Sequence, residues 1–86
     1  MIKVLTAVKD EAGNCFKDFQ VQETCAVAIR GFAAAVQENK FIMKNAKDFN
    51  LYFLGNWDNE TGQLTAHQPS IIATAEEFKI EEKESK

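Results

Sequence analysis

The sequence has few of the residues that staple or anchor a small protein. It contains two cysteines, Cys15 and Cys25, and no apolar run approaches the roughly 20 residues that cross a bilayer. Its start, MIKVLTAVKDEAG, is unlike a secretory signal peptide because it turns acidic by position 10. These features indicate a protein of the cytoplasm, with reduced thiols and no membrane partner. Because 86 residues bury only a modest core, we expect a homodimer or higher oligomer.

The chain also lacks an excess of basic charge. Its formal net charge is −3, of which the terminal stretch EEFKIEEKESK contributes −2 through five acids and three lysines. No overall field draws a polyanion to such a chain, so any contact with nucleic acid has to come from a local patch. We expect a single domain over residues 1–78 and an acidic, frayed tail over residues 79–86.

Residues for enzyme or metal chemistry are scarce as well. His67 is the single histidine, the cysteines lie ten positions apart, and the glycines are dispersed at positions 13, 31, 55 and 62. Metal sites need clustered ligands, a nucleophile needs an oriented base, and a phosphate loop needs closely spaced glycines. The sequence therefore predicts a protein that is not an enzyme and uses no metal or other cofactor.

The first half of the chain predicts a strand and a long helix. IKVLTAV alternates as a strand, with Lys3 and Leu5 on one face, whereas CFKDFQV fits a helical turn, an irregular anchor or a strand. Thr24 is expected to cap a helix, in which Gly31 marks a close approach to another backbone and Asn39 is a left-handed stop. The predicted apolar stripe of this helix is Ala26, Ile29, Ala33 and Val36, flanked by Cys25 and Phe32.

The second half predicts a hairpin and a short helix. Strands at about 51–57 and 63–67 flank the loop DNETG, where Gly62 is expected to adopt positive φ. Pro69 is expected to end the second strand, and Ser70 to cap a helix through Phe78. The predicted fold is α+β, with a small antiparallel sheet of about three strands and both helices packed on one face.

Alternation along residues 51–57 predicts which side chains face the long helix. Leu51, Phe53, Gly55 and Trp57 are expected under the helix, with Phe53 and Trp57 in the core. The opposite face is then predicted to hold the following residues: Lys3, Leu5, Tyr52, Leu54, Asn56, Thr65 and His67. Aromatic and basic groups on a sheet face suit nucleic acid, whereas exposed Leu5 and Leu54 suit a second subunit. On the residues alone, the subunit interface is slightly favoured.

Two motifs resemble a family of phage proteins. AIRGFAAAVQ, followed by KDFNLYFLGNWDNETGQL, is similar to the small nonstructural protein of gokushovirus-type microviruses, phages with single-stranded DNA. The matching residues are Ala28, Ile29, Arg30, Phe32, Asp48, Phe49, Leu51, Tyr52, Leu54, Gly55, Trp57, Asp58, Thr61 and Gly62. The resemblance covers about residues 15–78. It departs in NCFKDFQV, which lacks a proline often found there, and at Trp57, where phenylalanine is more common.

The resemblance implies a DNA-binding protein of the host cytoplasm that assists genome replication or the switch to single-strand synthesis and packaging. The residues that we expect to bind single-stranded DNA are Lys3, Arg30, Lys40, Lys44, Lys47 and Tyr52. Tyr52 would stack on a base and the cations would meet phosphates. The alternative is an adaptor that recruits or blocks host replication proteins without binding DNA. Leu5 and Leu54 are the predicted self-association residues.

Overall fold

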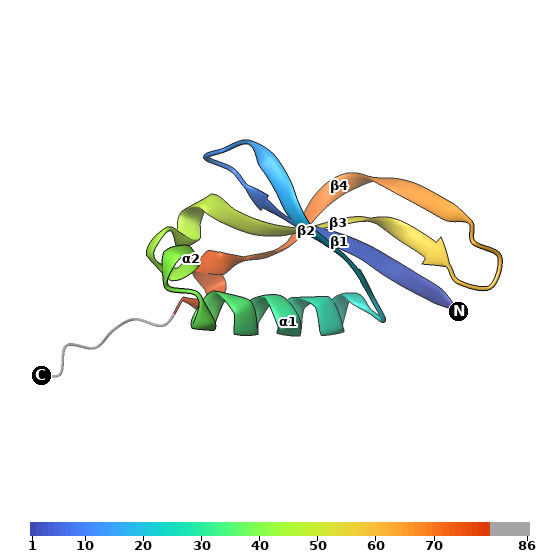
Figure 1. Ribbon diagram of the computed structural model, residues 1–86, viewed down its shortest axis with the longest axis horizontal. Helices are drawn as coiled ribbons and strands as arrows, with labels where there is room; N and C mark the ends of the chain where they lie inside the picture. Colours follow the sequence, from blue (N-terminus) through green and yellow to red (C-terminus); the bar gives the residue numbers. More distant parts are fainter. Residues whose placement is uncertain (80–86) are drawn as a thin grey trace, which may run out of the picture.

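The computed structural model describes residues 1–79 as a four-stranded antiparallel sheet with helices on one side (Figure 1). The strands β1 (Ile2–Asp10), β2 (Cys15–Gln22), β3 (Phe49–Asp58) and β4 (Leu64–Thr74) lie in the order β2-β1-β3-β4. The helices are α1 (Cys25–Glu38) and α2 (Lys40–Lys44), and the 3₁₀ turns are η1 (Ala46–Asp48) and η2 (Ala75–Phe78). The α+β class is confirmed, with four strands instead of about three. Apart from Lys79, the predicted tail lies outside the described residues.

The additional strand is β2. It is formed by CFKDFQV, the segment for which the sequence allowed a helical turn, an irregular anchor or a strand. Its pairing with β1 shifts between Thr6 and Val8, because two residues of β2 oppose Ala7 there. Asp18 lies in this bulge with φ of 56°, a left-handed conformation that aspartate tolerates better than most residues. The bulge explains the three-residue spacing of Phe16 and Phe19, because it brings both side chains to the same face of the sheet.

Helix α1 begins where the sequence predicts, but its buried stripe is only partly the predicted one, because Val36 and the flanking Phe32 are buried while Ala26 is not. The hydroxyl of Thr24 accepts a hydrogen bond of 3.1 Å from the backbone N–H of Val27. The buried residues are Ala28, Phe32 and Val36, spaced four apart, whereas Ala26 is exposed. The bulky ring of Phe32 therefore decides which side of the helix faces the sheet. Gly31 does not mark a close approach, because a Cβ there would meet nothing within 4 Å.

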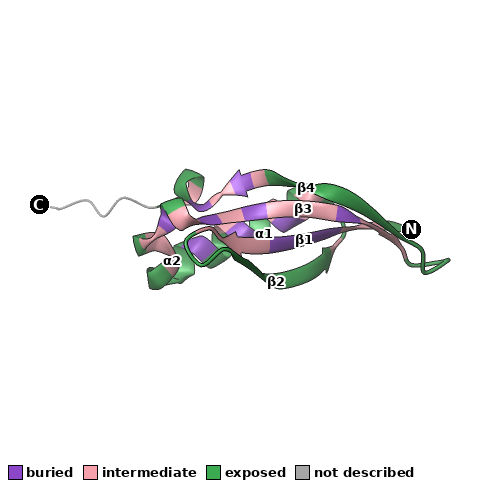
Figure 2. Cartoon of the chain, turned by 90° about the horizontal axis from the view of Figure 1, so that it is seen from above, coloured by how far each residue is buried: buried purple, intermediate pink, exposed green. Residues whose placement is uncertain are grey.

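The core lies between α1 and the inner face of the sheet. Its buried residues are Ala28, Phe32, Val36, Ala46, Phe49, Leu51, Ala73 and Ala75. Phe32 also meets Phe78 edge to face at 6.3 Å, which fastens η2 to α1. Figure 2 shows that the central strands β1 and β3 are largely buried or half-buried, whereas the edge strands β2 and β4 are mostly exposed.

Asn39 has a different role from the predicted left-handed stop. Its φ is −107°, and its side-chain oxygen accepts hydrogen bonds from the backbone N–H groups of Phe41 and Ile42, at 3.0 and 3.1 Å. It therefore ends α1 and caps the short α2 at the same time. The segment predicted as a mixed connection is thus mostly helical.

The predicted hairpin is confirmed, but its second strand is longer than expected. Gly62 has φ of 80°, as the loop requires. Strand β4 continues past Pro69 and Ser70 to Thr74. The predictions that Pro69 ends the strand and that Ser70 caps a helix are therefore wrong. Proline is tolerated because β4 is an edge strand and its pairing with β3 is irregular at this point. The cap of η2 is Thr74, which forms a capping box with Glu77.

A second irregularity lies at Leu54 in the middle of β3. Thr6 pairs with Phe53 and Leu5 pairs with Gly55, so Leu54 has no partner on β1. Because side chains alternate along a strand, this extra residue reverses the faces of everything that follows it in β3. Gly55 is required there, since its φ is 153° and a Cβ would overlap the backbone oxygen of Thr65.

Candidate nucleic-acid interface

The face of the sheet away from α1 carries aromatic and basic side chains from three strands. Val8 pairs with the core residue Leu51, so their strand neighbours point to the other face. The pairs Lys9 with Phe16, Lys3 with Trp57, and Ala7 with Tyr52 share that face. We call it the outer sheet face and define it by Lys3, Lys9, Phe16, Phe19, Tyr52 and Trp57. No helix of residues 1–79 covers it (Figure 1).

Phe16 and Tyr52 form the centre of the outer sheet face. Their rings meet edge to face, with centroids 5.1 Å apart and planes at 78°. The ammonium group of Lys9 lies 5.4 Å from the centroid of the Phe16 ring, within the range of a cation–π interaction. Phe16 is 44% exposed and Phe19 is 61% exposed, so the ring surface is accessible to a planar ligand.

Glu11 fixes the orientation of Tyr52. The Tyr52 hydroxyl donates to Oε2 of Glu11 at 2.7 Å, and the Asn50 amide donates to the same oxygen at 2.8 Å. These bonds, with the Asn50 bond the larger cause, hold the pKa of the Glu11 carboxyl below its ordinary value. The bond to the carboxylate raises the pKa of Tyr52. Tyr52 therefore stays a neutral phenol whose ring position is held by the turn after β1.

Both lysines of the outer sheet face are engaged by carboxylates. Nζ of Lys3 lies 2.7 Å from Glu23, and Nζ of Lys9 lies 3.5 Å from Glu11. The Glu23 side chain is 59% exposed, so this ion pair is open to solvent and to competing anions. A phosphate that approaches Lys3 has to displace Glu23.

The six residues predicted to bind DNA do not lie together. Lys3 and Tyr52 belong to the outer sheet face, whereas the other four lie in the helical layer and are exposed: Arg30, Lys40, Lys44 and Lys47. Arg30 lies between the buried Ala28 and Phe32 on α1, so it points away from the sheet. Lys40 and Lys44 are one turn apart on α2 and flank Phe41, which is 64% exposed. These four cations therefore lie outside the outer sheet face.

The predicted self-association residues are less exposed than expected. Leu5 is 8% exposed and buried, although it lies on the face away from α1, and Leu54 is half-buried in the bulge. Leu5 is sheltered because it occupies a central strand between two others. The exposed apolar side chains of this face lie on the edge strands instead: Val21 at 45%, Leu64 at 67% and Ile71 at 49%.

Because of the bulge at Leu54, the predicted faces are wrong for the part of β3 that follows it. Phe53 is half-buried on the helix side, where its ring meets His67 edge to face at 5.1 Å. Trp57 is half-buried as well, but it lies on the outer sheet face opposite Lys3, and not under the helix. Asn56 and Thr65 pair with each other on the helix side, so they leave the predicted outer set.

Sequence reasoning missed Lys9, Phe16, Phe19 and Trp57 as members of this surface. One signal was present, because an isolated glycine inside an apolar strand, here Gly55, is typical of a bulge. Among residues 1–79, no group of three or more His, Cys, Asp or Glu side chains is placed to hold a metal ion. No helix in this range is long and apolar enough to cross a membrane.

Comparison with known proteins identifies the family. Residues 3–78 match the sequence profile of the phage ORF5 protein family. The match covers most of the chain, so the chain belongs to this family and is a bacteriophage protein. No curated protein and no solved structure matches it.

Proposed function

We propose that this phage protein binds single-stranded DNA through its outer sheet face, and that it assists viral genome replication or the switch to single-strand synthesis and packaging. The observation that carries the proposal is the open aromatic surface of Phe16, Phe19, Tyr52 and Trp57 on a four-stranded sheet. Sheets with helices on one side and aromatic residues on the other are a recurring platform for stacking unpaired bases.

The geometry favours single strands over duplexes. Base stacking on Phe16 or Phe19 requires unpaired bases, since the bases of a duplex already stack on each other. The phosphate contacts available on the outer sheet face are Lys3 and Lys9, and both are partly neutralised by Glu23 and Glu11. Stacking should therefore supply more of the affinity than charge does, which agrees with a net charge of −3.

A titration of fluorescent oligothymidylate tests the proposal. The Phe16→Ala/Phe19→Ala variant should bind more weakly by about 1–3 kcal/mol for each base that loses its stacking partner. Phe41→Ala is the control, because it removes an exposed phenylalanine from the helical layer. Equal affinities of the wild type and the double variant would exclude the outer sheet face as the DNA site.

A second candidate function is a protein contact. The edge residues Val21, Leu64 and Ile71 form an apolar rim around the aromatic centre, and exposed apolar patches often mark protein interfaces. A second copy of this chain or a host replication protein would fit such a rim. Capture of a host protein by the wild type in the absence of DNA, and failure of oligonucleotide binding at low salt, would favour the adaptor.

A further inference from the structure

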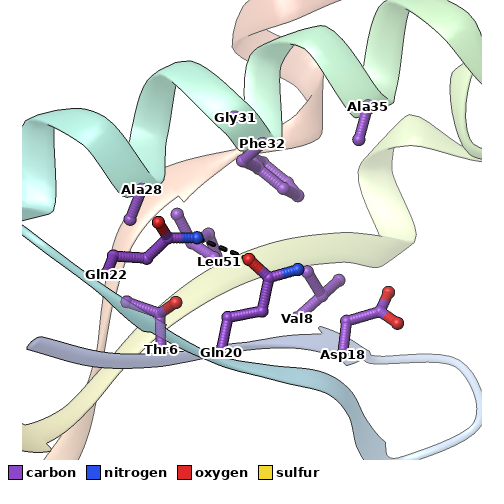
Figure 3. Close-up of a pocket in the computed structure, with 10 residues that line it drawn as sticks. All are labelled: Thr6, Val8, Asp18, Gln20, Gln22, Ala28, Gly31, Phe32, Ala35 and Leu51. Atoms are coloured by element: carbon purple, nitrogen blue, oxygen red, sulfur yellow. Dashed lines mark hydrogen bonds between the residues drawn. The ribbon is translucent and has the colours of Figure 1, made fainter.

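A cavity of about 290 Å³ opens between α1 and the edge strand β2, on the side of the sheet opposite the outer sheet face (Figure 3). Its β2 wall is polar and consists of Asp18, Gln20 and Gln22. The other wall is apolar, with Phe32 and Leu51 behind and the small side chains of α1 above. Such a cavity suits a flat ring that has polar groups along one edge.

The polar wall offers both acceptors and donors. The Gln22 amide donates a hydrogen bond to Oε1 of Gln20, and this leaves the Gln22 oxygen and the Gln20 amino group without another partner among residues 1–79. Asp18 stands at the rim of the cavity (Figure 3) and adds a carboxylate that only accepts hydrogen bonds when ionised. Its left-handed backbone, with φ of 56°, results from the β2 bulge.

We propose that this cavity binds one unpaired guanine base of the DNA strand, a proposal that rests on the proposed function. Guanine presents two neighbouring N–H donors, which suit the Asp18 carboxylate, and a carbonyl acceptor, which suits the Gln20 amino group. Adenine and cytosine place a ring acceptor where guanine has its ring N–H, so they leave the carboxylate without that donor. Thymine has a single N–H between two carbonyl oxygens, which repel a carboxylate.

The two surfaces lie on opposite sides of the same edge strand. Phe19 lies on the outer sheet face, while its chain neighbours Asp18 and Gln20 line the cavity. Strand β2 is at the edge of the sheet, so a DNA strand that crosses Phe16 and Phe19 reaches the cavity by turning around β2. A guanine inserted from this strand would add base selectivity to stacking that is otherwise indifferent to sequence.

The test uses free deoxynucleoside monophosphates, because their binding does not depend on the outer sheet face. NMR spectra should show shifts of the Gln20 and Gln22 side-chain amides on addition of dGMP, with binding about tenfold weaker for dAMP, dCMP and dTMP. Ala35→Met places a long side chain in the cavity from an exposed helix position and should abolish the shifts. Ala34→Met is the matched control, since Ala34 is also exposed on α1 but does not line the cavity.

Asp18→Asn probes the carboxylate alone. Asparagine accepts the left-handed backbone of the bulge, so the fold is kept, while an NH₂ donor replaces one of the two acceptor oxygens that pair with the guanine N–H groups. We expect about tenfold weaker dGMP binding and a loss of preference over dAMP. Equal responses to all four nucleotides, or shifts that persist in Ala35→Met, would overturn the cavity proposal.

The two proposals fail in distinguishable ways. Oligothymidylate binding that depends on Phe16 and Phe19, combined with no dGMP response at Gln20 and Gln22, removes the cavity proposal and keeps the proposed function. A selective dGMP response in a protein that binds no oligonucleotide supports a guanine site and removes its link to DNA.

Discussion

The hydroxyl of Tyr52 donates a hydrogen bond of 2.7 Å to Oε2 of Glu11, across 41 positions of the chain. This bond joins β3 to the turn that follows β1, and it fixes one ring of the outer sheet face. Because the bonds from Asn50 and Tyr52 favour the charged carboxylate, the pKa of Glu11 is lower in the folded protein than in the unfolded chain. The hydrogen bond that holds the Tyr52 ring therefore depends on pH, because it is strongest when Glu11 is ionised.

The first prediction concerns Tyr52→Phe. A carboxyl with a lowered folded pKa stabilises the fold above its unfolded pKa, and this stabilisation is lost as the pH falls through the folded pKa. The variant should therefore be less stable than the wild type at pH 7, and the difference should shrink in acid. Urea denaturation across the acid range measures this difference. In NMR titrations the Glu11 carboxyl of the variant should titrate closer to its ordinary value.

Tyr52→Phe also separates the two roles of this residue. Phenylalanine keeps the ring, so oligonucleotide stacking should be largely retained while the pH dependence changes. A stability difference that stays constant between pH 7 and strong acid would contradict the assigned role of Glu11.

The second prediction compares two glycines. Gly55→Ala should destabilise the fold by at least about 1–3 kcal/mol, because alanine at φ of 153° is strained and its Cβ overlaps the Thr65 backbone. Gly31→Ala should instead stabilise it by about 1 kcal/mol, since its Cβ meets open space in a helix interior. Thermal denaturation of both variants gives the comparison. Similar effects of the two substitutions would argue against the bulge at Leu54.

Elements with a regular period were predictable from the sequence. Strand β1 and helix α1 form where their residue patterns predict, although the buried stripe of α1 is shifted, and the Thr24 cap and the positive φ of Gly62 are confirmed because they rest on local chemistry. The prediction that Pro69 ends the strand failed because the effect of proline depends on whether the strand is central or at an edge of the sheet. That property belongs to the whole sheet and is not encoded near residue 69.

The candidate site was predictable only in part, because two bulges break the alternation on which face assignments rest. Lys3 and Tyr52 lie before or outside these bulges and were placed on the outer face correctly. Trp57 follows the bulge at Leu54, and Phe19 follows the bulge at Asp18, so simple alternation fails for both. The grouping of Arg30 with Lys3 failed for another reason, since Arg30 lies on the solvent side of α1, and α1 covers the face of the sheet opposite Lys3.

The third prediction concerns self-association, which we propose to involve the edge residues. Sedimentation at tens of micromolar should show a dimer or higher oligomer, because Val21, Leu64 and Ile71 are exposed on one face. Ile71→Lys should shift the protein toward monomer without loss of fold, since Ile71 is 49% exposed. Phe41→Lys, in the helical layer, is the control. A wild-type monomer at these concentrations would exclude the proposed self-association.

The fourth prediction concerns the lysines of the helical layer. If the DNA strand lies on the outer sheet face, about two phosphates are neutralised there, and log affinity should fall with log salt at a slope of about −1.4. The Lys40→Ala/Lys44→Ala/Lys47→Ala variant should keep this slope, because its lysines lie in the helical layer. Anisotropy titrations at several salt concentrations measure it. A slope reduced toward zero in this variant would place the phosphate contacts in the helical layer.

The last prediction concerns the ion pair of Lys3 and Glu23. Glu23→Gln removes the carboxylate that lies 2.7 Å from Nζ of Lys3 and competes with phosphate, so oligonucleotide affinity should rise. Stability should change by less than about 1 kcal/mol, because Glu23 is largely exposed. Glu38→Gln makes the same charge change at the end of α1 and is the control. If both variants raise affinity equally, the gain comes from net charge alone, and Lys3 is not the phosphate contact.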